Sequence, residues 1–170
     1  GIATSTNPNG CGGSNFGLLS EVAGAVSRLA FTTQPAGAST GAIIATQPVV
    51  KTQDQFGNNS TTNLASNLVV SVALASGPGP LLGNTNLNVG TTGANGTVTY
   101  TNLQIDVAGT NYQLTASAAG LSSALSSVFA VNGRPTISPI SNQTNNEDTV
   151  TGPVAFAIGD AETAANSLTL

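Results

Sequence analysis

Four of the chain's seven acidic residues lie near its C-terminal end, in NNEDTVTGPVAFAIGDAETAANSLTL (145–170). Glu147 and Asp148 are adjacent, and Asp160 and Glu162 stand two positions apart. Carboxylates are hard oxygen ligands, and Ca²⁺ takes about six to eight oxygens, backbone carbonyls included. The four residues are therefore a candidate calcium site, although they lack Asp-x-Asp-x-Asp spacing. The alternative is that Glu147 and Asp148 cap a turn while Asp160 and Glu162 lie on a solvated loop.

The side chains that common catalytic routes require are scarce. The chain has no histidine, so neither an imidazole base nor a histidine metal ligand exists, and Cys11, the only cysteine, has no imidazole to activate it. Glycoside hydrolysis needs two carboxylates held across a cleft, which part of a module cannot build. The glycine-rich pieces GANGT and NGCGG lack the strand-to-helix context of a phosphate loop. We expect the chain not to be an enzyme.

Several other reactive or modifiable residues have ordinary explanations. Cys11 lies in NPNGCGGSN, where it is either a free thiol or one half of an intermolecular disulfide. Lys51 could form an isopeptide crosslink or simply point outward from a strand. A sugar-binding face needs aromatic rings, and the chain has no Trp and only two Tyr. Asn-x-Ser/Thr triplets, which chance explains in so Asn- and Thr-rich a chain, begin at Asn58, Asn59, Asn95 and Asn142.

Composition points to an extracellular, cell-surface protein. Charged residues make up 6% of the chain, against about 25% in a typical soluble domain, so hydroxyls and amides must provide solubility. The net charge is −4, and the only cations are Arg28, Lys51 and Arg134, which argues against nucleic acid because that partner needs a basic face. No apolar run is long enough to cross a bilayer.

The elements that would position these residues are almost all β. Residues 1–15 read as irregular, and 16–27 as either a short helix or a strand with a linker. From residue 28, short apolar segments alternate with turn signals, which predicts an antiparallel β-sandwich of seven or eight strands over 28–131. The expected strands are 28–34, two pieces of 41–54 broken at Pro48, 67–76, a hairpin of 85–89 and 96–105 around GANG, 111–119 and 122–131.

Two turns carry residues that we expect to be structural. QDQFGNNST reads as a turn with Gly57 and Asn58 at its tip, and Asp54 is predicted to bond its own backbone there rather than to bind a ligand. After the last strand, NGRPTISPI reads as a linker. Residues 132–170 are then a linker and an incomplete second β module, with too few strands to close a sandwich.

The segment RLAFTTQPAGASTGAIIATQPVVKTQDQFGN (28–58) resembles the opening of a bacterial immunoglobulin-like repeat. Such repeats occur in tandem in large secreted adhesins of the gliding type. LQIDVAGTNYQLTASAAGLSSALSSVFAV (103–131) is similar to the last third of the repeat, with Asn111 inserted before Tyr112. The resemblance implies that Tyr112 is a tyrosine corner bonding upstream backbone, and that Asp106 stabilises the same turn.

The tail RPTISPISNQTNNEDTVTGPVAFAIGDAETAANSLTL (134–170) resembles the first half of a cadherin-like or immunoglobulin-like repeat. This resemblance implies that more residues follow, and that calcium is placed near a module junction. Residues 1–27 would then be the end of a preceding module.

Together these features predict a non-catalytic segment of a surface adhesin, acting as an extended stalk in adhesion or surface motility. Its expected partners are neighbouring modules of the same chain. Two alternatives stay open: a subunit of an extracellular filament assembled by β-strand donation, and a binding module of a secreted hydrolase.

Overall fold

The computed structural model describes residues 22–160, 162 and 167. These residues form eleven strands and contain no α-helix. In chain order the strands are β1 (Arg28–Thr33), β2 (Ala38–Ser39), β3 (Val49–Gln53), β4 (Val69–Ser76), β5 (Asn86–Asn88), β6 (Thr97–Thr99), β7 (Gly109–Ser117), β8 (Ala124–Leu125), β9 (Phe129–Asn132), β10 (Thr136–Ile137) and β11 (Ile158–Gly159). The prediction of an all-β fold is confirmed.

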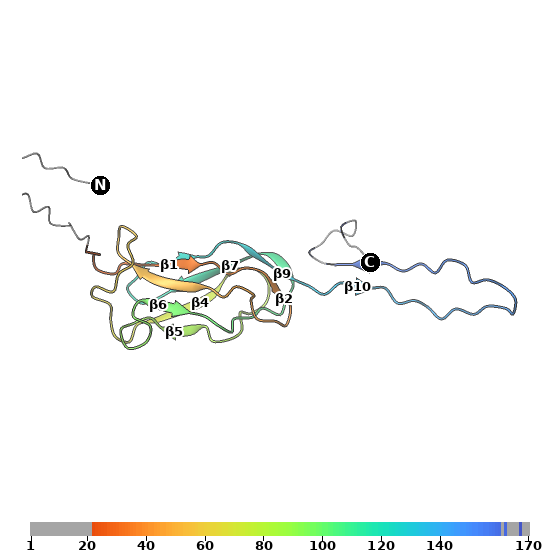
Figure 1. Cartoon of the computed structure of the whole chain (residues 1–170), viewed down its shortest axis with the longest axis horizontal. Coiled ribbons are helices and arrows are strands. Elements are labelled where there is room, and N and C mark those ends of the chain that lie inside the picture. The colour runs from red at the N-terminus through yellow and green to blue at the C-terminus, as the bar shows by residue number, and fades with distance from the viewer. Residues whose placement is uncertain (1–21, 161, 163–166, 168–170) are drawn as a thin grey trace, which may run out of the picture.

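The first nine strands form a sandwich-like body of two sheets (Figure 1). The smaller sheet has the order β1-β3-β6, and the larger has the order β2-β9-β7-β4-β5 with β8 beside β7. Paired strands are antiparallel except β2 and β9, which are parallel. The Leu29 amide donates to the Ser122 carbonyl at 2.9 Å, which links the two sheets along one side.

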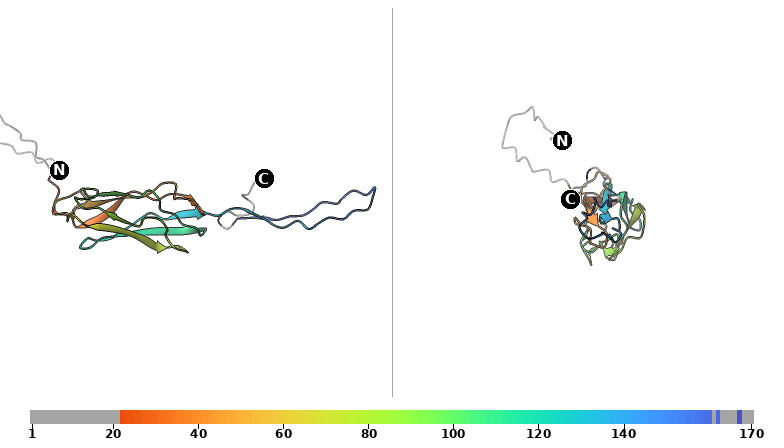
Figure 2. Two further views of the ribbon diagram at one scale, coloured as in Figure 1. Left: turned by 90° about the horizontal axis from the view of Figure 1, so that it is seen from below. Right: turned by 90° about the vertical axis from the view of Figure 1, so that its right-hand side faces the viewer.

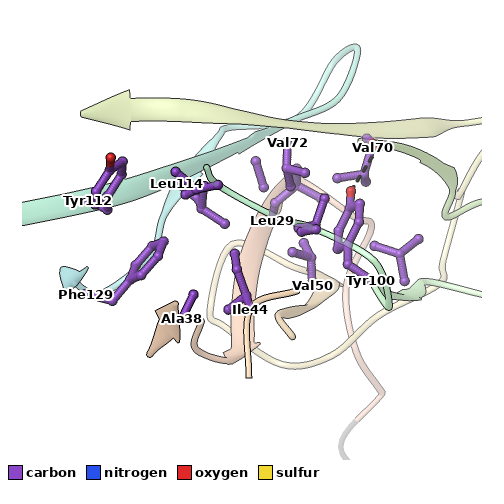
Figure 3. Packing of buried hydrophobic residues seen from close by; sticks show 14 of the residues in the cluster. Leu29, Ala38, Ile44, Val50, Val70, Val72, Tyr100, Tyr112, Leu114 and Phe129 are labelled. Atoms are coloured by element: carbon purple, nitrogen blue, oxygen red, sulfur yellow. Dashed lines mark hydrogen bonds between the residues drawn. The ribbon is translucent and has the colours of Figure 1, made fainter. Parts of the chain in front are cut away.

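Alternating side chains fill the space between the sheets (Figure 3). In β3, Val50 and Thr52 are buried while Lys51 between them is not, and β4 and β7 repeat the same two-residue period. The core residues with the largest fully buried side chains are Tyr100, Tyr112, Ile44, Leu103, Ile105, Leu114, Val50, Val70, Val89, Val98 and Val131. Each large apolar side chain of this kind contributes roughly 1.5–3 kcal/mol on burial.

The hairpin predicted around GANG (93–96) is wrong. β5 pairs with β4 and β6 pairs with β3, so these two strands lie in opposite sheets. The chain crosses between the sheets at Val89 and Gly90, whose amides both donate to the Leu68 carbonyl, at 2.7 and 3.2 Å. A Cβ on Gly90 would lie 2.5 Å from the carbonyl carbon of Ser66, so only glycine fits. Local alternation identified both strands but carried no information about their partners.

Of the two strands predicted in 41–54, only the second, β3, is regular. The first piece makes isolated bridges rather than a ladder. Its buried Ile44 donates its amide to the Leu103 carbonyl at 2.8 Å. The Gln47 side chain bonds both backbone groups of Leu103, at 2.9 and 3.0 Å, and so takes the place of strand pairing just before Pro48.

A short helix was one of the two structures expected for residues 16–27. The structure describes residues 22–27 of this segment, and they have no regular secondary structure, so the helix does not form there. The remainder of that segment, like residues 1–15 and Cys11, lies outside the described residues. Among the described residues, no helix is long and apolar enough to cross a membrane.

The body is elongated, with the chain approaching it at one end and leaving at the other (Figures 1 and 2). Beyond β9, residues 134–160 run outward along the long axis and return; we call this the C-terminal arm. Its two sides pair only near the base, where Thr136 faces Gly159 and Ile137 faces Ile158. A two-stranded element of this kind has little core of its own.

Candidate functional site

The hydroxyl of Tyr112 is anchored to the backbone near the end of the body from which the arm leaves. It lies 2.6 Å from the carbonyl oxygen of Val107 and 2.9 Å from that of Pro78, so its proton is donated to one or shared by both. The ring is fully buried and packs on Phe129 with centroids 5.8 Å apart (Figure 3). Tyr112 thus holds together the loop between β4 and β5, the loop that precedes β7, and strand β9.

Asn111, the residue inserted before Tyr112, forms a β-bulge. Gly109 pairs with Val131, and Tyr112 pairs with Phe129. Between these two pairs, β7 advances by three residues and β9 by only two. Asn111 has a φ of 64°, a left-handed conformation that asparagine tolerates better than most residues. Bulges re-aim neighbouring side chains, and this one precedes the inward-pointing Tyr112.

A carboxylate just beyond the arm reaches this end of the body. Oε2 of Glu162 accepts the amide hydrogen of Gly133 at 2.7 Å. Burial raises the pKa of the Tyr112 hydroxyl, and the negative charge of Glu162 raises it further. Asp106, which was expected to stabilise the Tyr112 turn, is exposed and accepts instead from the Gln104 side chain.

Asp54 organises the opposite, N-terminal end of the body and is 1% exposed. Its Oδ1 accepts the amides of Phe56 and Asn58 at 2.9 and 3.0 Å, which closes the predicted turn. Its Oδ2 accepts the Asn58 side chain at 3.1 Å and the amide of Gly24 at 2.9 Å. Asp54 therefore also fastens the segment that precedes β1, a contact that local sequence did not predict.

Burial alone would raise the pKa of Asp54, but hydrogen bonds from Gly24, Asn58 and Phe56 outweigh it and lower the pKa from 3.8 to about 2. Ser60 strengthens the same fastening, since its hydroxyl donates to the Gly24 carbonyl. Each oxygen of the Asp54 carboxylate accepts two hydrogen bonds from the protein, so its role is structural.

Gly57 occupies the tip of this turn with a φ of 93°, a conformation that favours glycine. A Cβ at this position would lie 2.6 Å from Nη2 of Arg28. The guanidinium of Arg28 therefore lies over the turn, and Gly57 leaves room for it.

The four carboxylates proposed for calcium are separated along the arm. Glu147 and Asp148 lie at its tip, in a turn closed by the Thr149 amide bonding the Asn146 carbonyl at 3.2 Å. Asp160 and Glu162 lie at its base, just beyond β11. Across the described residues, no three His, Cys, Asp or Glu side chains gather into a metal-binding group. The predicted set of four does not fit one calcium ion.

Asp160 and Glu162 each have one buried carboxylate oxygen with no hydrogen-bond partner among the described residues. These atoms are Oδ1 of Asp160 and Oε1 of Glu162. Two carboxylate oxygens are fewer than calcium requires. Calcium binding stays a prediction, now confined to this pair.

The remaining reactive residues gain no new role from the structure. Lys51 faces outward from β3, and the Asn-x-Ser/Thr triplets at 58, 59, 95 and 142 are not part of any shared site. Two surface hollows are open to solvent: one of about 400 Å³ lies against residues 37–45, and one of about 270 Å³ lies against residues 24–27, Asp54 and Gln55. Asp54 is the only ionisable group that lines either of these two hollows, and its oxygens already accept hydrogen bonds from the protein.

We compared the chain with protein-family models, with curated proteins and with solved structures, and none of the three gave a match. The functional argument therefore rests on the chain's own geometry. That geometry places structural sites at the two ends of the body, where the chain arrives and leaves.

Sequence reasoning missed Gly24, whose amide bonds Asp54, and Gly77, whose backbone lies against the ring of Tyr112. It also missed Gln47, which lies outside these two sites and bonds the backbone of Leu103. Gly77 alone gave a signal, since the GPGP run marks a turn in which glycine takes positive φ.

Proposed function

We propose that the chain is a non-catalytic, load-bearing segment of a secreted surface adhesin, with residues 28–131 as an immunoglobulin-like repeat. The observation that carries this proposal is the arrival and departure of the chain at opposite ends of an elongated body (Figure 2). Modules built in this way add length when they are joined, which is the property that a stalk requires.

The pairing of the first and last strands of the body, β1 and β9, favours resistance to a pull along the long axis. β1 pairs with β3 from Arg28 to Thr33, and β9 pairs with both β7 and β2. A pull on the two ends acts lengthwise on β1 and β9, so the hydrogen bonds of each ladder share the load. The amide of Thr40 adds a further bond, to the Asn132 carbonyl at 2.9 Å.

The contacts at the two ends support the same role. Asp54 and Ser60 fasten Gly24 before β1, and Glu162 bonds Gly133 after β9. The chain is therefore secured on both sides of the sandwich, and a load reaches the strands only after passing these contacts. The low charge fits a surface solvated by hydroxyls and amides.

Force spectroscopy on tandem copies of the chain tests the mechanical part of the proposal. We expect a distinct unfolding peak for each copy when the copies are pulled through their ends. Thr40→Pro removes the amide that bonds Asn132, and we expect a lower unfolding force, whereas Thr40→Ala keeps the amide and should match the original chain. Unfolding without a resolvable peak would contradict a load-bearing role.

Location and size test the adhesin part. An antibody raised against residues 28–131 should label intact cells, and brief protease treatment of those cells should remove the signal. On a denaturing gel, the native protein should migrate far above the 16.7 kDa of this chain. A native species of 16.7 kDa inside the cell would overturn the proposal.

A further inference from the structure

The C-terminal arm has backbone and apolar groups that lack partners. Its two sides pair at β10 and β11, and the Ser138 amide adds one bond to the Ala157 carbonyl at 2.8 Å. Within residues 139–143 and 150–156, no backbone group bonds another backbone group of the described chain. Large apolar side chains exposed along the arm are those of Ile137, Ile140, Val150, Val154 and Phe156. Such a segment is suited to adding to a sheet edge.

One side of the arm has the pattern of a strand. Val150, Val154 and Phe156 fall at even positions, so in an extended chain they share one face. Val150 is 94% exposed, and Phe156 is 46% exposed. Pro153 has no amide, and in an extended chain it lies on the opposite side from the amides of Gly152 and Val154. The side that carries those two amides is therefore the one that can pair with a sheet edge.

The sandwich offers an open edge at β6. β6 is the last strand of the β1-β3-β6 sheet, and the described chain places no strand beyond it. On its outward face, the side chains of Thr97 and Thr99 alternate with the buried Val98. The opposite edge of this sheet, β1, is partly covered because the Leu29 amide bonds the Ser122 carbonyl at 2.9 Å. Of the two edges of the β1-β3-β6 sheet, β6 is therefore the more accessible for an added strand.

Charge favours the same pairing. Residues 132–170 carry Arg134 against four carboxylates, a net charge of −3. The β1-β3-β6 sheet carries Arg28 and Lys51 and no acidic residue. Lys51 faces outward from β3, opposite Thr97 of β6. A strand added to β6 lies two strand spacings from β3, about 10 Å, which is close to the Debye length in physiological salt.

The arm points away from its own body (Figures 1 and 2), so it reaches the β6 edge of a different molecule more readily than its own. We propose that residues 150–156 of one copy add as a strand to β6 of a second copy, with the acidic arm beside the cationic sheet. The arrangement is head-to-tail and leaves one free edge and one free arm at its ends. Because each end of the arrangement can bind a further copy, it extends into chains of copies. This inference rests on the arm and on β6, not on the adhesin proposal.

Sedimentation velocity of the full chain over a range of concentrations tests the inference. We expect species heavier than 16.7 kDa that grow with concentration and dissociate as salt is raised. Val154→Pro removes an amide from the side that can pair, whereas Ala155→Pro removes one from the side of Pro153. Val154→Pro should weaken association about tenfold, whereas Ala155→Ser should leave it unchanged.

A charge-swap experiment identifies both surfaces. Glu147→Lys with Asp148→Lys on the arm, and Lys51→Glu on the sheet, should each reduce self-association. Mixing the two variants should restore it, because each mixture contains an original arm and an original sheet. Asp106→Lys serves as the control, since that carboxylate is exposed outside both surfaces.

Three outcomes would overturn the proposal: a chain that stays monomeric at every concentration and salt, proline variants that both associate like the original, or a mixture that stays dissociated. The melting midpoint of each variant checks that the sandwich is intact. Association that persists in both proline variants would assign the contact to another surface and so contradict the proposal.

Discussion

The ring of Tyr112 lies directly against the backbone of Gly77. A Cβ on Gly77 would lie 2.5 Å from Cε1 and 2.8 Å from Cγ of that ring. Gly77 also has a φ of 106°, where side chains are disfavoured. The loop after β4 can therefore approach the tyrosine only because position 77 has no side chain, and this approach brings the Pro78 carbonyl to the hydroxyl.

Gly77→Ala should be strongly destabilising for two separable reasons. The positive φ costs about 1–2 kcal/mol for any side chain, and displacing a buried ring costs about 1–3 kcal/mol more. Gly120→Ala is a matched control, because Gly120 has a φ of 76° but nothing within 4 Å of the added Cβ. Urea unfolding should show a loss for Gly77→Ala that exceeds the loss for Gly120→Ala. Equal losses would mean that the ring moves aside freely.

Tyr112→Phe removes the hydroxyl while keeping the ring. The carbonyls of Val107 and Pro78 then lose their donor, and we expect a loss of about 1–2 kcal/mol in the free energy of unfolding. Tyr100→Phe offers a comparison, since its buried hydroxyl donates to the Val70 carbonyl at 3.1 Å. If Tyr112→Phe unfolds at the same urea concentration as the original chain, the hydroxyl contributes no net stability.

The sequence predicted local structure well where burial and alternation coincide. β4 and β7 stand out because the side chains of Val70, Val72, Tyr112 and Leu114 all face the core at two-residue spacing. The turn at Asp54 was predicted for a similar reason, since aspartate and glycine stand at the positions that a turn requires.

Partners distant along the chain could not be predicted from the same signals. Alternation in 85–105 is the same whether β5 and β6 pair with each other or join opposite sheets, and the close backbone approach at Gly90 accompanies the second arrangement. Likewise, nothing around Asp54 indicates a bond to an amide 30 residues earlier. The four C-terminal carboxylates are close together in the sequence, but the length of the arm separates the two pairs in space.

The calcium prediction now concerns Asp160 and Glu162 rather than all four carboxylates. If calcium binds there, millimolar calcium, a range typical of extracellular modules, should raise the melting midpoint, and EDTA should reverse the change. Asp160→Asn with Glu162→Gln should abolish the response, and Glu147→Gln with Asp148→Asn should preserve it. A midpoint unaffected by calcium and by EDTA in the original chain would remove the metal hypothesis.

Asp54 should make the body sensitive to acid through its contact with Gly24. Its pKa in the folded chain is about 2, below the usual 3.8. A lowered folded-state pKa means that the carboxylate stabilises the fold fully above about pH 4, and that this contribution is lost as the pH falls towards 2.

Asp54→Asn removes the charged acceptor, so the free energy of unfolding should fall at pH 7 and differ less from the original at pH 2. Asp106→Asn is the control, because it makes the same substitution at an exposed position away from the contact with Gly24. Parallel pH profiles for the original chain and Asp54→Asn would show that the Asp54 charge does not stabilise the fold.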